Sequence, residues 1–247
     1  MTPALCTIAV DPSLPPGDLL ETWRALAAAL PQAALATDPR LPAGQQRLLL
    51  EEARRGGVEV VEVALPLLGP RGRPAPRFCS PDGEERRAAK DALLDAVRLA
   101  ETHQAARIII FPELLDLRWG PSTLARWFAQ GVALRLEPLH RERPQAASEA
   151  LDHWRRGLEP ALSAADGGGL SIEFLGPTIY PQQCPDTVEV ATLQAEFAGA
   201  QLGYQEATDW AHARCQLLGD EGEANAAAEV PEQPPLPQEI LAMLPAK

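Results

Sequence analysis

The sequence predicts an α/β fold in which crossover helices join parallel strands, as a barrel or as a doubly wound sheet. The first observation is composition: 46% of the 247 residues are hydrophobic, but only 5% are aromatic. Such a core consists mainly of Leu, Val, Ile and Ala, which suits parallel strands and packed helices. The second observation is that strand-like and helix-like segments alternate six times, the order that produces parallel sheets.

Short apolar segments bounded by Gly, Pro or polar residues indicate buried strands. They are residues 5–10, 33–37, 58–65, 106–112, 170–174 and 201–206. The clearest is VEVVEVAL at 58–65, which is rich in β-branched residues and lies between GG and LLGP. The fifth strand, in GGGLSIEFLGP, contains the carboxylate of Glu173. A charge beside apolar strand residues is costly unless it is compensated, so Glu173 requires either a partner or a function.

Five intervening segments carry apolar residues at helical spacing. They are residues 18–30, 43–55, 81–103, 145–166 and 186–198. Asp18 is predicted to cap the first helix, and Gly56 and Gly57 to end the second. Ser80 is predicted to cap the third, with Pro81 at its first position and acids in its first turn. The buried face of this third helix is expected at Ala89, Leu93, Val97 and Ala100.

The secondary structure of two regions is harder to predict from the sequence. Within residues 113–145, the pattern allows a helix over 124–136 or a strand over 132–136. In the second interpretation Glu137, in LEPL, takes the role of Glu173, although the long helix and glycine turn before Glu173 favour Glu173. From residue 219 the chain is acidic and rich in Ala and Pro, which predicts a flexible tail, 219–247, with a short apolar end, after a domain over 1–218.

Charge and composition argue against several classes of protein. The net charge is −12 and the pI about 4.8, which disfavours binding to nucleic acid or to an anionic membrane. No signal peptide and no apolar run of roughly 18 residues is evident. The four cysteines form no CxxC pair, and no GxGxxG or GxxxxGK[ST] turn is present, which argues against a cysteine zinc site and a nucleotide site. We expect a cytoplasmic protein with reduced thiols.

Three stretches resemble segments of a known family. Residues 80–112, SPDGEERRAAKDALLDAVRLAETHQAARIIIFP, resemble a helix start, a long amphipathic helix and a strand. Residues 158–177, LEPALSAADGGGLSIEFLGP, resemble a helix, a glycine turn and a fifth strand with a terminal glutamate. Residues 209–212, DWAH, resemble an Asp-x-x-His after the sixth strand. Over roughly residues 58–215 the chain resembles the xylose-isomerase-like TIM barrels, a broad family of sugar-phosphate isomerases and epimerases.

The resemblance implies a TIM-barrel-like fold and an isomerase or epimerase of a small sugar or hydroxy-carbonyl compound. By the resemblance, Glu173 and Asp209 hold a divalent metal (Mn²⁺, Mg²⁺ or Zn²⁺) that polarises the carbonyl. His212 then positions the substrate. Glu113 stands at the end of the fourth strand, where the family has a histidine, and is a candidate catalytic group. Glu206 is an alternative to Asp209, which lies about two residues later than a gapless alignment would place it.

The departures from the family pattern suggest a second hypothesis. The fourth strand ends in Phe111-Pro112 where the family has His-Pro, and residues 67–69 read Leu-Leu-Gly where a His is often found. Only 35 residues follow His212, without a His or a strand-like run. The barrel is therefore predicted to be incomplete or modified at its C-terminal end, its open edge covered by the tail, a second copy or a partner protein. The alternative function is a catalytically inactive, barrel-derived binding or scaffold protein.

Each candidate residue also has a structural interpretation. Glu173 would pair with an Arg or a backbone N–H, and Asp209 and Glu113 would cap helices. His140, Arg141 and Arg143 would bind a phosphate or form a solvated loop. The remaining candidates are expected to be buried thiols, surface histidines and packing tryptophans: Cys184, Cys215, His103, His153, Trp23, Trp119, Trp127, Trp154 and Trp210.

Overall fold

The computed structural model describes residues 15–29, 34–69, 73–115, 117, 133–176 and 183–206. Its centre is a five-stranded parallel sheet with the order β1-β2-β3-β5-β7. The strands are β1 Leu35–Ala36, β2 Val60–Ala64, β3 Arg107–Ile110, β5 Ser171–Gly176 and β7 Leu202–Glu206. Each strand of this sheet pairs with the next one along the chain. A doubly wound sheet reverses its order at a switch point, so the described order is that of a barrel wall.

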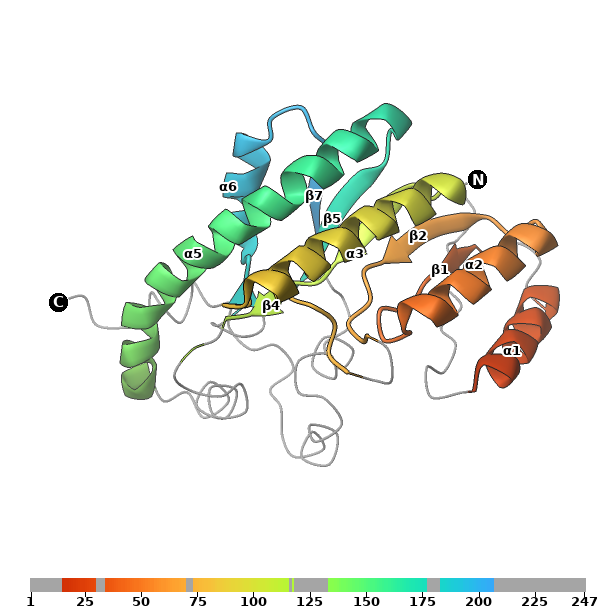
Figure 1. Ribbon diagram of the computed structural model, residues 1–247, viewed down its shortest axis with the longest axis horizontal. Helices are drawn as coiled ribbons and strands as arrows, with labels where there is room; N and C mark the ends of the chain where they lie inside the picture. Colours follow the sequence, from red (N-terminus) through yellow and green to blue (C-terminus); the bar gives the residue numbers. More distant parts are fainter. Residues whose placement is uncertain are drawn as a thin grey trace.

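Helices cover one face of this sheet (Figure 1). They are α1 Pro16–Ala29, α2 Ala43–Gly56, α3 Gly83–Thr102, α5 Ala133–Ala165 and α6 Thr187–Glu196, with a 3₁₀ turn, η2, at Asp166–Gly168. Figure 1 shows α2, α3 and α5 lying side by side in front of the strands. This helix-strand alternation confirms the predicted α/β class and the TIM-barrel-like wall. None of the helices within the described ranges is long and apolar enough to cross a membrane.

The helical pattern of the sequence corresponds to the buried face of the helices. Ala89, Leu93, Val97 and Ala100 of α3 are all buried, as the spacing predicts. α2 ends where Gly57 adopts a left-handed φ of 68°, a conformation that glycine reaches without a Cβ penalty.

Two predicted helix starts are wrong. Ser80 does not cap α3: its hydroxyl hydrogen bonds to Glu85 and accepts the Asp82 N–H at 3.1 Å. Asp82 is the cap, because its carboxylate accepts the Glu84 N–H at 2.9 Å. Asp18 lies inside the first turn of α1, which starts at Pro16. Ser80 and Asp82 are both good capping residues, and the side-chain geometry chooses between them.

The first residues of α5 show which of the two interpretations of residues 132–136 is correct. Because α5 begins at Ala133, the strand interpretation of 132–136 is wrong, and Glu137 lies within a helix. His140, Arg141 and Arg143 are in the same helix, so the predicted solvated loop is also wrong. Arg143 pairs with Asp186 at 3.0 Å and with Glu189 at 2.7 Å. Those two acids form the capping box at the start of α6, so Arg143 ties α5 to α6.

Aromatic side chains pack between the helices and the sheet. Trp154 of α5 is fully buried, with its ring centroid 4.3 Å from that of Phe78 and 5.2 Å from that of Phe174. The Phe78 ring also lies so close to Gly157 that a Cβ there would overlap it. Trp23 of α1 is buried too, so the packing role predicted for Trp23 and Trp154 is confirmed.

A second, two-stranded sheet was not predicted. β4 Glu113–Leu114 pairs antiparallel with β6 Gln183–Cys184, which places Glu113 opposite Cys184. Cys184 is fully buried, as expected. The predicted strand at 5–10, residues 124–132 of the predicted helix at 124–136 and the tail from 219 lie outside the described residues, as do Trp119, Trp127 and Trp210. Residues 133–136 of that helix are helical, as the first turn of α5.

Candidate functional site

The face of the sheet away from the helices carries the sequence-predicted carboxylate. Side chains alternate between the two faces of a strand. Ile108, Ile110, Ile172 and Phe174 pack in the main core under the helices. Glu173 and Ile109 therefore point to the opposite face, which we call the inner face. Glu62 and Arg107 of neighbouring strands share it, since Glu62 is paired with Arg107 and Arg107 with Ser171.

Three charged side chains cross the inner face as one network, here called the charged layer: Glu62, Arg107 and Glu173. The Arg107 Nε lies 2.6 Å from a Glu62 carboxylate oxygen. The Arg107 guanidinium also lies 4.0 Å from Glu173 Oε2. Ser171 donates its hydroxyl to Glu173 Oε1 at 3.0 Å. The side chains of Glu62, Arg107 and Glu173 are only 19–28% exposed. Each of the two carboxylates therefore depends on Arg107 for charge compensation.

The Glu173 carboxylate points toward the amino ends of the strands. Its partners Arg107 and Ser171 are the first residues of β3 and β5. The stem of Glu173 crosses Gly203 of β7, where a Cβ would lie 3.0 Å from Glu173 Cγ. Barrels hold their chemistry at the opposite, carboxyl ends of their strands. In this conformation Glu173 belongs to the charged layer and lies beside Arg107. This agrees with the structural alternative, in which Glu173 pairs with an arginine.

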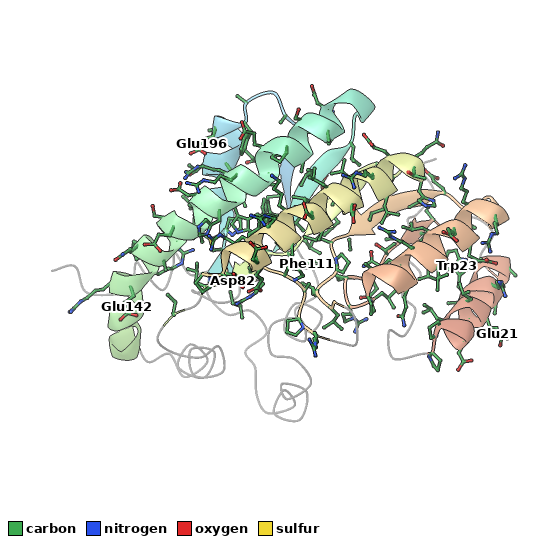
Figure 2. All side chains as sticks on the ribbon, viewed as in Figure 1. Glu21, Trp23, Asp82, Phe111, Glu142 and Glu196 are labelled. Carbon is green, nitrogen blue, oxygen red and sulfur yellow. The ribbon has the colours of Figure 1, made fainter. Side chains whose placement is uncertain are left out.

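The carboxyl half of the inner face is apolar. Ala64, Ile109 and Phe111 are buried together, and Leu67 and Leu175 pack against them. Phe111, labelled in Figure 2, directly follows β3. It occupies the place where the family pattern has histidine. This part of the site therefore offers an apolar wall.

Glu113 is the carboxyl group that lies beyond the carboxyl end of β3. Its Oε1 accepts the Phe78 N–H at 2.9 Å, and its Oε2 accepts the Cys79 N–H at 2.7 Å. Burial raises the pKa of Glu113 to about 7, although these N–H groups and Arg77 favour the ionised form. Among the described residues it caps no helix; it joins β4 to the loop before α3.

Two thiols lie beside Glu113. The Cys79 thiol reaches the Cys184 carbonyl oxygen at 4.0 Å. The pKa of Cys79 is raised well above its usual value, first by its hydrogen bond with the Cys184 side chain, then by burial and by Glu113. Such a thiol stays protonated at neutral pH, so it is a poor nucleophile.

The described residues bring together only part of the predicted site. Glu173 lies in β5 of the parallel sheet and Glu113 in β4 of the two-stranded sheet, and within the described ranges no hydrogen bond or ion pair joins them. Asp209, His212 and Cys215 lie outside those ranges, and Glu206 is the last residue of β7. Among the described residues, no group of three or more His, Cys, Asp or Glu could hold a metal ion. His103 and His153 lie half-buried at helices rather than at the strand ends.

Sequence reasoning missed the partners of both glutamates. Arg107 begins the strand RIII as its only charged residue, a signal that a cross-strand partner exists. Glu62 stands at the corresponding level of β2. The role of Phe78 and Cys79 could not be found in this way, because a backbone N–H leaves no trace in residue type.

Comparisons with known proteins agree with this fold. A scan against protein-family models and a search of curated proteins give no match. Among solved structures, 3-keto-D-glucoside 4-epimerase from E. coli has a TM-score of 0.55 at 12% identity, covering 88% of this chain and 72% of the epimerase.

Two further structures match at lower scores. D-allulose 3-epimerase from Methylomonas sp. in complex with D-allulose has a TM-score of 0.49 at 10% identity, covering 80% of this chain and 59% of that one. A Thermus thermophilus protein soaked with ZnCl₂ has a TM-score of 0.47 at 20% identity, covering 78% and 64%. The match to the 3-keto-D-glucoside 4-epimerase, with the strand order described above, shows that the chain shares the α/β fold of that epimerase.

Proposed function

We propose that the protein is a sugar isomerase or epimerase that acts on a small sugar or hydroxy-carbonyl compound, with Glu113 as its acid/base group. The observation that carries the proposal is the Glu113 carboxyl with a pKa of about 7, located beyond the carboxyl end of β3. A general acid or base works best when its pKa lies near the working pH. Perturbed carboxyls of this kind concentrate at functional sites.

The chemistry follows from that pKa. Near neutral pH about half of the Glu113 carboxyls are ionised, so the group can both remove and return a proton. When Glu113 removes the proton from the carbon next to a carbonyl, an enediolate forms, and return of that proton to the neighbouring carbon gives the isomer. Epimerisation also requires a second acid, which delivers a proton to the opposite face of the same carbon. The N–H groups of Phe78 and Cys79 hold the carboxylate in one orientation. Each oxygen keeps a further lone pair for substrate.

Metal binding is a separate proposal, in which Glu173 and Asp209 hold Mn²⁺, Mg²⁺ or Zn²⁺ and His212 positions the substrate. The described surroundings of Glu173 do not fit a divalent ion, because the Arg107 cation lies 4.0 Å away and, among the described residues, no group of three or more His, Cys, Asp or Glu includes it. No catalytic step is therefore routed through a metal here. Elemental analysis and thermal shift with each ion test it; no bound ion and no stabilisation would reject a metal at Glu173.

Solvent exchange tests the role of Glu113. In D₂O the wild type should incorporate deuterium next to the carbonyl of a converted hydroxy-carbonyl substrate, as followed by NMR over a panel of ketoses and aldoses. Glu113→Gln should slow exchange by about 100-fold or more. Glu85→Gln is the matched control, because Glu85 contacts the same loop through Arg77 and Ser80. Equal exchange in wild type and Glu113→Gln, or none with any substrate, would overturn the proposal.

A second candidate function is a non-catalytic binding or scaffold protein. The favouring observation is that both described glutamates have structural partners: Glu173 in the charged layer, and Glu113 on two backbone N–H groups. In this case the chain pairs with a second copy or a partner protein. Light scattering should then show a dimer or complex, and no solvent exchange should be detected. A lone monomer that exchanges substrate protons would exclude this candidate.

A further inference from the structure

A pocket lies at the ends of α2 and α3, away from the candidate site. It encloses about 430 Å³ and is lined by Arg47, Glu51, Arg54 and Arg55 of α2 and by Leu99 and His103 at the end of α3, among others. Both helices run toward the amino ends of the strands, since β2 and β3 follow them. The pocket is therefore at the opposite end of the sheet from Glu113. Its volume falls in the range of small-molecule sites.

The pocket is basic in a chain whose net charge is −12. Arg55 is neutralised by Glu51 at 3.5 Å and Glu52 at 2.9 Å. Among the described residues, the ion-pair partner of Arg47 is the distant Asp95 at 3.7 Å, and both of these side chains are about half exposed. An exposed ion pair of that kind holds its partner weakly.

Arg54 and His103 are the two pocket residues that matter most for an anion, Arg54 as an exposed cation and His103 as a partly buried imidazole. Within the described part of the chain, Arg54 forms no ion pair or hydrogen bond through its side chain. The His103 Nδ1 atom is buried without a described hydrogen-bond partner. Burial and then the charge of Arg54 lower the pKa of His103, while Glu51 opposes this. A negatively charged ligand would neutralise Arg54 and would lie against the His103 ring, since both residues line the pocket.

We propose that this pocket binds a small molecule carrying a phosphate monoester, held by Arg47, Arg54 and His103. Arginine is suited to this role because its planar guanidinium donates two parallel hydrogen bonds to phosphate oxygens. The pocket is larger than a phosphate group alone, and Leu99 gives it an apolar wall for the carbon part of the ligand. The proposal does not depend on the proposed function, since none of its residues contacts Glu113 or the charged layer.

Calorimetric titration at constant ionic strength tests the proposal, with inorganic phosphate and glycerol 3-phosphate as probes and chloride as the salt control. Constant ionic strength is needed because salt screens such contacts. We expect glycerol 3-phosphate to bind with a Kd of about 1 mM or tighter, more tightly than inorganic phosphate. Arg54→Gln should weaken binding about tenfold. Arg87→Gln removes the same charge from an exposed ion pair on α3 and should leave binding unchanged.

NMR of the His103 ring gives a second readout. Bound phosphate offsets the charge of Arg54, so the pKa of His103 should rise when glycerol 3-phosphate is added, with the resonance assigned through His103→Gln. Binding with this shift, lost in Arg54→Gln, supports the site. No binding of either probe, equal weakening by Arg54→Gln and Arg87→Gln, or an unchanged His103 pKa would each overturn it.

Discussion

Glu173 of β5 and Glu113 of β4 are glutamates in two contrasting environments. Glu173 lies over the amino half of the sheet, with Arg107 and Ser171 as side-chain partners. Glu113 lies beyond the carboxyl end of β3, with backbone N–H groups as its nearest donors and a pKa raised to about 7 by burial. A charged partner keeps a carboxylate in its structural role, whereas burial without one leaves a group able to exchange a proton near neutral pH.

The two ends of the sheet are also stabilised in different ways. At the amino end, charged side chains from three adjacent strands compensate one another. At the carboxyl end, Phe78, Trp154 and Phe174 form an aromatic stack behind the loop that supplies the hydrogen bonds to Glu113. Loss of the stack should therefore disturb Glu113 and leave the charged layer in place.

The largest effect is expected from Trp154→Ala. The substitution leaves a cavity between α5 and the sheet and removes the support of Phe78, so it should lower the free energy of unfolding by about 3–5 kcal/mol. Urea unfolding followed by circular dichroism measures this. Trp154→Phe should recover most of the loss. A cost below about 1 kcal/mol for Trp154→Ala would show that the stack does not support the carboxyl end.

Arg107→Ala should have the next largest effect, on the other region. It leaves Glu62 and Glu173 close together without their cation, and we expect a cost of about 1–3 kcal/mol because both carboxylates retain some contact with water. The matched control is Arg98→Ala, which breaks the exposed pair with Asp95 and should cost at most about 0.5 kcal/mol. Equal costs in urea unfolding would mean that the charged layer is no more than surface pairing.

Glu113 should make stability depend on pH in a direction that follows from its pKa. Because the folded-state pKa of about 7 is above the ordinary 4.5, the folded protein binds the proton more tightly than the unfolded chain. Its contribution is therefore present at low pH and is lost as the pH rises from about 4.5 to about 7. The loss should be on the order of 1–3 kcal/mol, the upper value being the free energy that corresponds to the whole pKa difference of a buried carboxyl.

Glu113→Gln isolates this contribution, because it removes the titrating group. Urea unfolding of wild type and Glu113→Gln across this pH range should give a stability difference that changes with pH in the direction stated above. A difference that is constant with pH would indicate an ordinary Glu113 pKa. That result would remove the main support for its acid/base role.

Gly203→Ala should have the smallest effect on the free energy of unfolding, and it tests where the Glu173 side chain lies. The new Cβ would lie 3.0 Å from Glu173 Cγ, so the flexible side chain must shift by a few tenths of an ångström. We expect a cost below about 1 kcal/mol. In a Glu173→Ala background the cost should vanish, since nothing is left to displace. Additive effects in this double-mutant cycle would place the Glu173 stem elsewhere.

Much of the fold could be predicted from local patterns, and the errors have specific causes. The alternation of helix and strand predicted the parallel sheet, and the apolar spacing of α3 predicted its buried face. The cap of α3 was misplaced by two residues because Ser80 and Asp82 are both suitable, and only the contact of Ser80 with Glu85 excludes it. The start of α5 was missed because periodicity in a short apolar run does not separate helix from strand.

The sequence alone determined the class of fold and the presence of a charge at Glu173, because residue spacing and polarity are local properties. Tertiary structure alone decided what those charges do. It paired Arg107 with two glutamates from strands far apart in the chain, and it placed Glu113 against the backbone of Phe78 and Cys79. Those partners depend on strand order and on main-chain donors, which residue type does not encode, and they decide which carboxylate is compensated and which has a raised pKa.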